Sequence, residues 1–244
     1  MKIFTEQKNI EEKFIRITDK GDIRHMLKVM RMKEGDQIDV SDSVQWEYRA
    51  EILSADEDLV LLSILDKQKF AREPKIEVTL FQGIPKAGKM ETIIQKCVEL
   101  GVHDIVPVFM DRTVVVEKGN FSKKLERWQK ISDEAVKQCK RGVIPQICDQ
   151  VRTADLAGML GDYDLVLFPY ENEDVYTIKD CLRGLSPKPK RVAVIIGPEG
   201  GFSDREAEAM DEIGAAKVTL GKTILRTETA GMAALAMIMY ELEL

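Results

Sequence analysis

The stretch VAVIIGPEGG, Val192 to Gly201, decides the fold class, and VTLGKTILRTETAG, Val218 to Gly231, repeats its plan later in the chain. Residues 192 to 196 form an unbroken apolar run, which predicts a buried strand that stops at the Gly197-Pro198 break. The loop that follows ends in two adjacent glycines. Because glycine has no side chain, we expect the backbone amides of this loop to be uncovered, so that a ligand can lie against them.

A helix start follows each of the two predicted strands. Ser203 and Glu206 have the spacing of a capping box at the start of one helix. After the second strand, 217 to 220, Thr227 is expected to cap a long apolar helix that begins near Glu228. Open α/β sheets bind ligands between the carboxyl end of a strand and the amino end of a helix. The two stretches therefore predict an α/β fold with a ligand site at the edge of a parallel sheet, although two ordinary βα turns would have the same pattern.

Composition places the chain among globular proteins, with 44% hydrophobic and 32% charged residues in a length of 244. A net charge of -6 is not that of a generally basic nucleic-acid binder. The four cysteines form no CxxC pair and only two histidines are present, so we expect reduced thiols, a cytoplasmic protein and no metal. We also expect no signal peptide, and the longest apolar run, 230 to 240, is too short to cross a membrane.

The first part of the chain predicts a small β-barrel with one helix. Short alternating runs at 37–40, 46–53 and 59–65 predict strands. The segment GDIRHMLKVMRM, 21 to 32, predicts a helix with one apolar and one basic face, and the basic face can meet an RNA backbone. The residues alone favour a merely solvated face. The basic side chains are Arg24, Lys28 and Arg31, with His25 beside them.

A polar stretch with a proline, 67 to 74, separates this part from the rest of the chain. Beyond it, short strands give way to alternating strands and helices, among them a predicted strand at 104–109. We therefore predict a small β-barrel over residues 1–70 and an α/β domain over residues 71–244.

The segment GIPKAGKM resembles a nucleotide P-loop, because Gly83, Gly88 and Lys89 have the required spacing. A P-loop continues with serine or threonine to hold magnesium, and this chain has Met90 there. Hydrolysis of ATP or GTP is therefore disfavoured. Lys86 and Lys89 are interpreted instead as basic groups at the mouth of the sheet, available to phosphates or simply solvated.

A predicted helix from 122 to 141 ends in a cationic turn before Gly142. Gln138 and Arg141 lie three residues apart, on one face, and together could donate hydrogen bonds to phosphates or base edges. Cations at a helix carboxyl end are also favourable through the helix dipole alone.

Three predicted strands, ending near residues 169, 196 and 220, can line one pocket with backbone groups and small apolar walls. Its charged residues are Glu199, Arg226 and Glu228. Such a pocket suits a neutral adenosine group better than a triphosphate, which needs lysines and a metal. The GPEGG loop lacks the GxGxxG spacing of dinucleotide-binding folds. A hydrolytic triad is disfavoured because both histidines lie far away in the sequence.

The combination of IIGPEGGFSDREAE and VTLGKTILRTETAGMAAL resembles the SPOUT methyltransferases, and specifically the ribosomal RNA small subunit methyltransferase E family. The blocks KAGKMETIIQKCVELGVHDIVPVFMDRTVV and DEAVKQCKRGVIPQI are similar to further recurrent blocks of that family, and HMLKVMRMKEGDQI to its amino-terminal domain. The resemblance covers nearly the whole chain.

This resemblance implies an α/β SPOUT domain whose backbone is tied in a deep trefoil knot, preceded by a PUA-like β-barrel for RNA. Pattern analysis alone would not predict a knot, because threaded loops are almost absent from proteins. The resemblance also implies S-adenosylmethionine as cofactor, a homodimer with the site at the subunit contact, and methylation of uridine N3 in 16S ribosomal RNA. By the match of positions, the cofactor pocket would consist of Leu167, Phe168, Gly197, Pro198, Glu199, Gly200, Gly201, Leu220, Gly221, Leu225, Arg226, Thr227 and Glu228.

Methylation at N3 requires loss of the N3 proton, so the site must stabilise a developing uracil anion. Arg226 is the first candidate for that role, and Glu199 or Glu228 is the candidate proton acceptor, unless Glu199 only holds its loop. The target base must be unpaired or splayed out. The alternatives are a non-catalytic RNA-binding assembly factor and another SPOUT activity, such as ribose 2′-O-methylation. The expected RNA contacts are Arg24, His25, Arg31, Lys86, Lys89, Arg112, Gln138 and Arg141.

Overall fold

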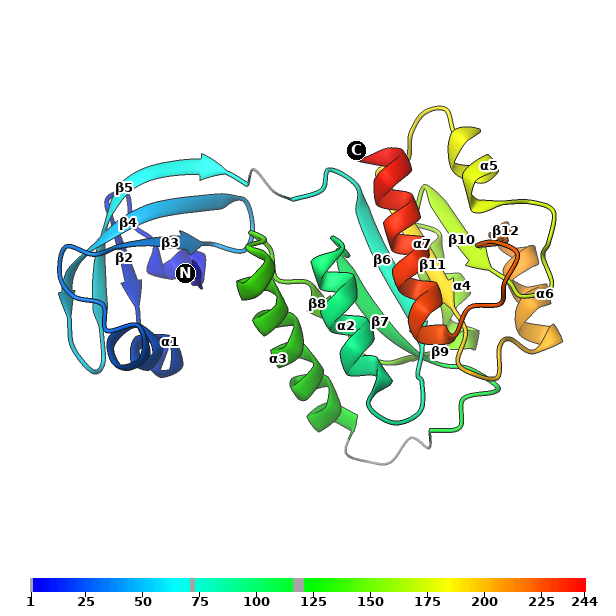
Figure 1. Ribbon diagram of the computed structural model, residues 1–244, viewed down its shortest axis with the longest axis horizontal. Coiled ribbons are helices and arrows are strands. Elements are labelled where there is room, and N and C mark those ends of the chain that lie inside the picture. Colours follow the sequence, from blue (N-terminus) through cyan, green and yellow to red (C-terminus); the bar gives the residue numbers. More distant parts are fainter. Residues whose placement is uncertain (1, 71–72, 116–120) are drawn as a thin grey trace. The chain divides into compact units, whose positions relative to one another are not determined.

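The computed structural model of the chain describes residues 2–70, 73–115 and 121–244. The chain divides into two compact units (Figure 1). The first consists of Met1–Glu73 with Val136–Ile144, and the second of Pro74–Ala135 with Pro145–Leu244. Helix α3 (Phe121–Cys139) contributes to both, because its last turn belongs to the first unit.

The first unit is a five-stranded sheet in the order β1-β3-β4-β5-β2, antiparallel except for the parallel pair β1–β3. Its buried core includes Ile3, Ile15, Met26 and Val40, and the alternating burial of the strands follows the period of two that the sequence predicts. One helix covers the sheet, as predicted, but its second half is a π-helix. The elements are β1 (Lys2–Phe4), η1 (Gln7–Asn9), β2 (Phe14–Ile17), α1 (Lys20–Arg24), η2 (His25–Val29), β3 (Gln37–Ser41), β4 (Trp46–Ala55) and β5 (Val60–Lys69).

The segment that follows α3 completes the first unit through hydrogen bonds to β3 and the turn after it. The Ser41 hydroxyl donates to the Gly142 carbonyl over 2.6 Å. The amide of Ile144 donates to the Ser43 hydroxyl over 3.1 Å. The first unit therefore depends on residues that lie far along the chain from the strands they contact.

The second unit is a parallel sheet in the order β12-β10-β11-β6-β7-β8, with β9 also paired to β7. The predicted strand 104–109 is reproduced at both ends. The elements are β6 (Glu77–Gly83), α2 (Lys89–Glu99), β7 (Asp104–Phe109), β8 (Gln146–Ile147), β9 (Val151–Arg152), α4 (Thr153–Leu160), β10 (Leu165–Pro169), α5 (Ile178–Arg183), β11 (Arg191–Ile196), α6 (Asp204–Glu212), β12 (Ala216–Val218) and α7 (Thr227–Leu242).

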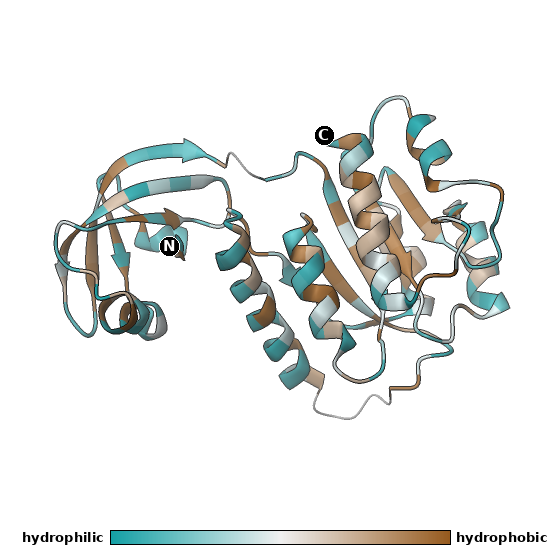
Figure 2. Ribbon diagram, in the orientation of Figure 1, coloured by the Kyte–Doolittle hydropathy of each residue, from teal (hydrophilic) through white to brown (hydrophobic). Residues whose placement is uncertain are grey.

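Helices cover both faces of this sheet. Helix α7 packs against α2, α5, β6 and β11, and Figure 1 shows α7 and α2 side by side on one face. The opposite face carries α4 and α6, whose Leu156 and Met210 join a core with Phe81 and Ile195 of the strands. A parallel sheet buried on both faces needs continuous apolar strands, and hydrophobic residues run along these strands in Figure 2. The α/β fold predicted from VAVII is confirmed.

The start of α7 differs from the sequence prediction. Arg226, and not Thr227, is the N-cap, and its side chain makes no capping hydrogen bond. The Thr227 hydroxyl is instead engaged with Gln82 and with the carbonyl of Gly197. The capping box predicted at Ser203 and Glu206 is confirmed at the start of α6.

Candidate functional site

Three loops meet at one edge of the second sheet, where β10, β11 and β12 end. The strands are direct neighbours, since Leu167 pairs with Val194 and Pro169 with Val218. Because the strands are parallel, their carboxyl ends lie at the same edge, which is where open α/β sheets bind ligands. Leu167 and Phe168 are fully buried. They therefore offer a ligand their backbone and not their side chains.

The loop after β11 is a tight turn held by its neighbours. The amide of Gly201 donates to the carbonyl of Pro198 over 3.0 Å, so the expectation that both glycine amides are uncovered is wrong for Gly201. Gly201 has φ +67°, and a side chain there would collide with the carboxylate of Glu171. The Arg112 guanidinium donates to the Gly200 carbonyl over 3.0 Å. The turn thus has one geometry, set by glycine and by these contacts.

A buried relay of hydrogen bonds joins three segments beneath this turn. The Gln82 amide group donates to the Thr227 hydroxyl over 2.9 Å, and that hydroxyl donates to the Gly197 carbonyl over 2.6 Å. Gln82 is fully buried at the end of β6, and its Oε1 atom accepts no hydrogen bond from the described residues. At Gly83 an added Cβ would lie 2.6 Å from the Pro198 nitrogen, so the two backbones approach closely. Sequence patterns gave no indication of Gln82, because its partners lie far along the chain.

Lys89 lies between two of the predicted catalytic carboxylates. Its Nζ is 3.0 Å from Glu199 Oε1 and 3.2 Å from Glu228 Oε2, and the Glu228 contact is an ion pair without good hydrogen-bond alignment. Glu199 also accepts from the backbone amide of Lys86 over 3.1 and 3.2 Å. These contacts connect the β6–α2 loop with the loop after β11 and with the start of α7.

The charged side chains of Lys89, Glu199 and Glu228 shift one another's pKa values. Pairing with Glu199 and Glu228 raises the pKa of Lys89, against a smaller opposing effect of desolvation. Burial raises the pKa of Glu199, but hydrogen bonds from Lys89 and from backbone amides outweigh it, and the net pKa is lowered. A hydrogen bond from its own amide lowers the pKa of Glu228, and Lys89 and Arg226 lower it further. Both carboxylates are therefore weaker bases than an ordinary glutamate.

Arg226 is a cation of this edge that remains available to a ligand. It is exposed, and its side chain makes no hydrogen bond or ion pair with any residue that the structure describes. It lies at the mouth of the loop between β12 and α7. Leu220 and Leu225 of the same loop are half-buried, and Gly221 between them has φ +141°. The loop therefore combines partly exposed apolar side chains with one unpaired guanidinium.

The other predicted RNA contacts have different surroundings. Arg141 is 6% exposed and donates from Nη2 to Glu73 Oε2 over 2.8 Å, so its role in this structure is to hold the first unit together. A cation buried in an ion pair is not displayed to RNA. The exposed members of the predicted set are Arg24, His25, Arg31, Lys86, Arg112 and Gln138.

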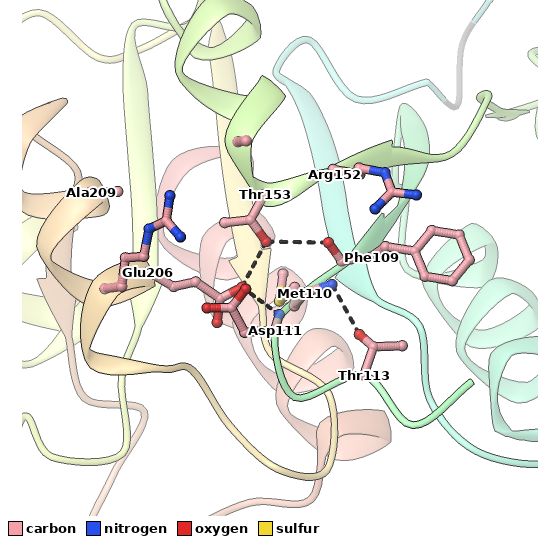
Figure 3. A pocket seen from close by; sticks show the side chains of 10 residues that line it. Phe109, Met110, Asp111, Thr113, Arg152, Thr153, Glu206 and Ala209 are labelled. Carbon is pink, nitrogen blue, oxygen red and sulfur yellow. Dashed lines mark hydrogen bonds between the residues drawn. The ribbon is translucent and has the colours of Figure 1, made fainter. Parts of the chain in front are cut away.

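A second hollow, which the sequence analysis missed, lies at the end of β7 (Figure 3). It has a volume of about 660 Å³ and is lined by residues from β7, the junction of β9 and α4, and α6. Its residues come from separate segments, so no single sequence motif marks it. Within the described ranges, 2–70, 73–115 and 121–244, no cluster of three or more potential metal ligands occurs, and no helix is long and apolar enough to span a membrane.

Comparison with known proteins gives consistent results for both parts of the chain. Residues 72–239 match the family model described as RNA methyltransferase domain, and residues 17–65 match the RNA methyltransferase PUA domain. The chain is 35% identical over 228 residues to ribosomal RNA small subunit methyltransferase E of Bacillus subtilis, which covers 91% of this chain and 89% of the relative.

Solved structures agree with these matches. The ribosomal RNA small subunit methyltransferase E of Neisseria gonorrhoeae, bound to S-adenosyl methionine, superposes with a TM-score of 0.84 at 27% identity, over 98% of this chain and 96% of the other. A methyltransferase of Legionella pneumophila in complex with the same cofactor gives a TM-score of 0.83 at 29% identity, over 98% and 96%.

Proposed function

The chain belongs to the ribosomal RNA small subunit methyltransferase E family, and on that premise we propose that it transfers a methyl group from S-adenosylmethionine to N3 of a uridine in 16S ribosomal RNA. The observation that carries the proposal is the unpaired Arg226 at the mouth of three backbone-rich loops.

The residues at this edge suit S-adenosylmethionine, which supplies an electrophilic methyl group when bound. The loops after β10, β11 and β12 present backbone groups and the half-buried Leu220 and Leu225, as a neutral adenosine group requires. They present no cluster of unpaired lysines for a triphosphate, since Lys89 is neutralised by two carboxylates. The residues proposed to hold the cofactor are Leu167, Phe168, Gly197, Pro198, Glu199, Gly200, Gly201, Leu220, Gly221, Leu225, Arg226, Thr227 and Glu228.

The chemical demand on the protein is to make uridine N3 nucleophilic. The N3 proton passes to a base, and negative charge spreads over the imide oxygens until the N–C bond is complete. S-adenosylmethionine would supply the methyl group, with the electrons of the broken S–C bond staying on sulfur and S-adenosylhomocysteine as the leaving group. A guanidinium without an internal partner stabilises that charge more strongly in the transition state than in the ground state, and we assign this role to Arg226. The two neighbouring carboxylates, Glu199 and Glu228, differ in how many contacts they make within the protein.

Glu199 accepts hydrogen bonds from the Lys86 amide and pairs with Lys89, so we assign it to holding the loop. Glu228 has Lys89 as its single ion-pair partner among the described residues and lies two positions after Arg226. We assign Glu228 as the proton acceptor. Because the pKa of its carboxyl is lowered, transfer of the N3 proton to it requires Arg226 to stabilise the uracil anion.

RNA binding is proposed for exposed cationic and polar side chains of each unit. In the first unit these are Arg24, His25, Arg31 and Gln138, and in the second Lys86 and Arg112. Lys89 and Arg141 are left out because carboxylates already neutralise them. Exposed cations supply most of the affinity for a phosphate backbone and make it dependent on salt.

We also propose a homodimer through α7. Tyr240 is 70% exposed and Met237 is 36% exposed, three residues apart on one face of this helix. Exposed apolar side chains on a helix mark an interaction surface, and a self-complementary face favours a two-fold dimer. Light scattering should give twice the chain mass for the wild type and a smaller mass for Tyr240→Lys. A wild-type mass of one chain at micromolar concentration would rule the dimer out.

The decisive experiment is transfer of labelled methyl from S-adenosylmethionine to small ribosomal subunits purified from cells that lack this gene. The modified RNA is digested and the labelled nucleoside is identified by mass spectrometry. We expect 3-methyluridine. A ribose-methylated nucleoside would replace this proposal with another SPOUT activity, and no incorporation would favour an RNA-binding assembly factor.

A further inference from the structure

The hollow at the end of β7 has the size and the side chains of a binding site and lies outside the three loops described above. Its volume of about 660 Å³ falls within the range typical of small-ligand pockets. Phe109 and Thr113 come from the end of β7 and the loop after it, Arg152 and Thr153 from the start of α4, and Arg205 from the first turn of α6. All belong to the second unit.

The floor of the hollow is a buried carboxylate whose acceptor sites are filled. Glu206 is 3% exposed, and its Oε1 accepts from the Asp111 amide over 2.9 Å and from the Thr153 hydroxyl over 2.7 Å. Its Oε2 accepts from the Ser203 amide over 2.9 Å. Figure 3 shows Glu206, Asp111 and Thr153 meeting at the centre of the view. These bonds fix three segments in one geometry and stabilise the buried carboxylate. Asp111 is a second carboxylate of the lining and accepts from the Ser203 hydroxyl, so the two arginines of the hollow face two acidic side chains.

The walls combine an aromatic ring with cations. Phe109 is half-buried, and its ring packs against Phe121 of α3 with the ring centroids 5.3 Å apart. Figure 3 shows the Phe109 ring and the Arg152 guanidinium on the same side of the hollow. Arg205 is exposed and forms no hydrogen bond or ion pair with residues 2–70, 73–115 or 121–244. A flat ring beside guanidinium groups is the combination that binds unpaired nucleotides, because bases stack on aromatic faces and phosphates pair with arginine.

The hollow is coupled to the loop after β11. The Ser203 hydroxyl donates to the Asp111 carboxylate over 2.6 Å, and the Arg112 side chain donates to the Gly200 carbonyl over 3.0 Å. The residues around the hollow are thus bonded to the same turn that borders the proposed methyl-transfer site. A ligand in the hollow can therefore be bound at the same time as a ligand at the proposed methyl-transfer site.

We propose that this hollow binds an unpaired nucleotide of the substrate RNA, next to the nucleotide that is methylated. The base stacks on the part of the Phe109 ring that Phe121 leaves exposed, and its phosphate is held by Arg205. The proposal rests on the proposed function, in that the ligand is a strand of the substrate RNA, and it adds a binding subsite that recognises a flanking nucleotide. Sequence-specific RNA recognition mostly targets single-stranded loops and bulges, whose bases can stack on aromatic side chains.

The test compares Arg205→Ala with Lys179→Ala in the full-length protein. Lys179 is an exposed lysine of α5 and has no partner among the described residues, so it serves as the matched control. Binding of a fluorescein-labelled, single-stranded oligoribonucleotide is followed by anisotropy over a salt series. We expect Arg205→Ala to raise the Kd about tenfold and to lower the salt slope by about one, as for the loss of one phosphate contact. The Kd for S-adenosylmethionine should stay unchanged in both variants.

Ala209→Phe is a second, independent variant, because Ala209 lines the hollow and a larger side chain fills it. It should also raise the Kd for RNA while leaving cofactor affinity unchanged. Equal RNA affinity in the wild type, Arg205→Ala and Ala209→Phe would overturn the proposed subsite, whatever the result for methyl transfer. RNA binding that depends on Arg205, in a protein that transfers no methyl, would uphold the subsite and overturn the proposed reaction instead.

Discussion

The start of α2 and the β12–α7 loop each place a cation at the same edge of the second sheet, one paired and one unpaired. Lys89, the first residue of α2, pairs with Glu199 and Glu228, whereas Arg226 of the loop is exposed and unpaired among the described residues. A paired cation stabilises the shape of a site, and an unpaired one remains available to charge that develops on a substrate. The difference separates a residue that builds the pocket from one that acts in it.

The largest effect is expected from Arg226→Ala. Methyl transfer should fall about 10²–10³-fold in kcat, because a group that stabilises charge only in the transition state is lost. The thermal unfolding midpoint should stay unchanged, since the side chain makes no bond within the described chain. Single-turnover kinetics measures the rate, with Lys222→Ala, an exposed lysine of the same loop, as control. Wild-type turnover in Arg226→Ala would remove this residue from the mechanism.

Thr227→Val is expected to destabilise the protein by about 1–3 kcal/mol, because the part-buried Gly197 carbonyl loses its hydroxyl donor and the buried Gln82 amide group keeps only the Gly83 carbonyl as acceptor. Thr229→Val, in the same turn of α7 but exposed, is the matched control. Urea denaturation gives the unfolding free energies. Equal stability of the two variants would mean that the relay beneath the turn contributes nothing to the fold.

Lys89→Met should mainly weaken cofactor binding. Without the ammonium group, Glu199 and Glu228 repel each other, and the loop after β11 loses one of its supports. The side chains are partly exposed, so solvent screens the effect, and we expect a rise of roughly fivefold in the Kd for S-adenosylmethionine. Lys89→Arg should restore part of the affinity. Isothermal titration calorimetry measures the Kd for S-adenosylmethionine. A tighter Kd in Lys89→Met would contradict the role of Lys89 in supporting the loop after β11.

The ion cluster of Lys89, Glu199 and Glu228 predicts that the stability of the protein falls both in acid and in strong alkali. The folded-state pKa values of Glu199 and Glu228 are lowered, so their contribution is present at neutral pH and is lost as the pH falls below about 4. The pKa of Lys89 is raised, so its contribution is present below about pH 10 and is lost as the pH rises further. The midpoint of urea unfolding, measured against pH, should fall less steeply in acid for Glu199→Gln than for the wild type. The same decrease of the urea midpoint at acid pH in both proteins would show that the ion cluster does not contribute to the pH dependence of folding.

The sequence predicted most of what depends on local pattern. The strand 104–109, the capping box at Ser203 and the strand–loop–helix plan around Gly197 follow from periodicity and capping chemistry, which act over a few residues. Family resemblance added the fold and the reaction class. The trefoil knot stays a prediction, as does the uridine N3 target.

The features that the sequence analysis predicted wrongly or missed all depend on partners that are distant in sequence. Thr227 has the residue type of an N-cap, but its hydroxyl bonds to Gly197 and Gln82, and Arg226 takes the capping position. Arg141 has the position of an exposed cation at a helix end, but Glu73 buries it in an ion pair. The hollow above Glu206 is formed by several segments at once. Pattern and propensity contain no information on such pairings, so a tertiary contact decides them.

The smallest effect is expected at Ala87, in the middle of the β6–α2 loop. Ala87 has φ +51°, a left-handed conformation that costs an L-residue about 1 kcal/mol and that the neighbouring bond from the Lys86 amide to Glu199 holds in place. Ala87→Gly removes this strain but adds unfolded-state entropy, so we expect a gain of a few tenths of a kcal/mol. Ala157→Gly, at an exposed position inside α4, should instead cost about 1 kcal/mol. Urea denaturation measures the change in unfolding free energy for both substitutions. Changes of opposite sign would show that the β6–α2 loop stores backbone strain at Ala87, whereas equal losses would mean that it does not.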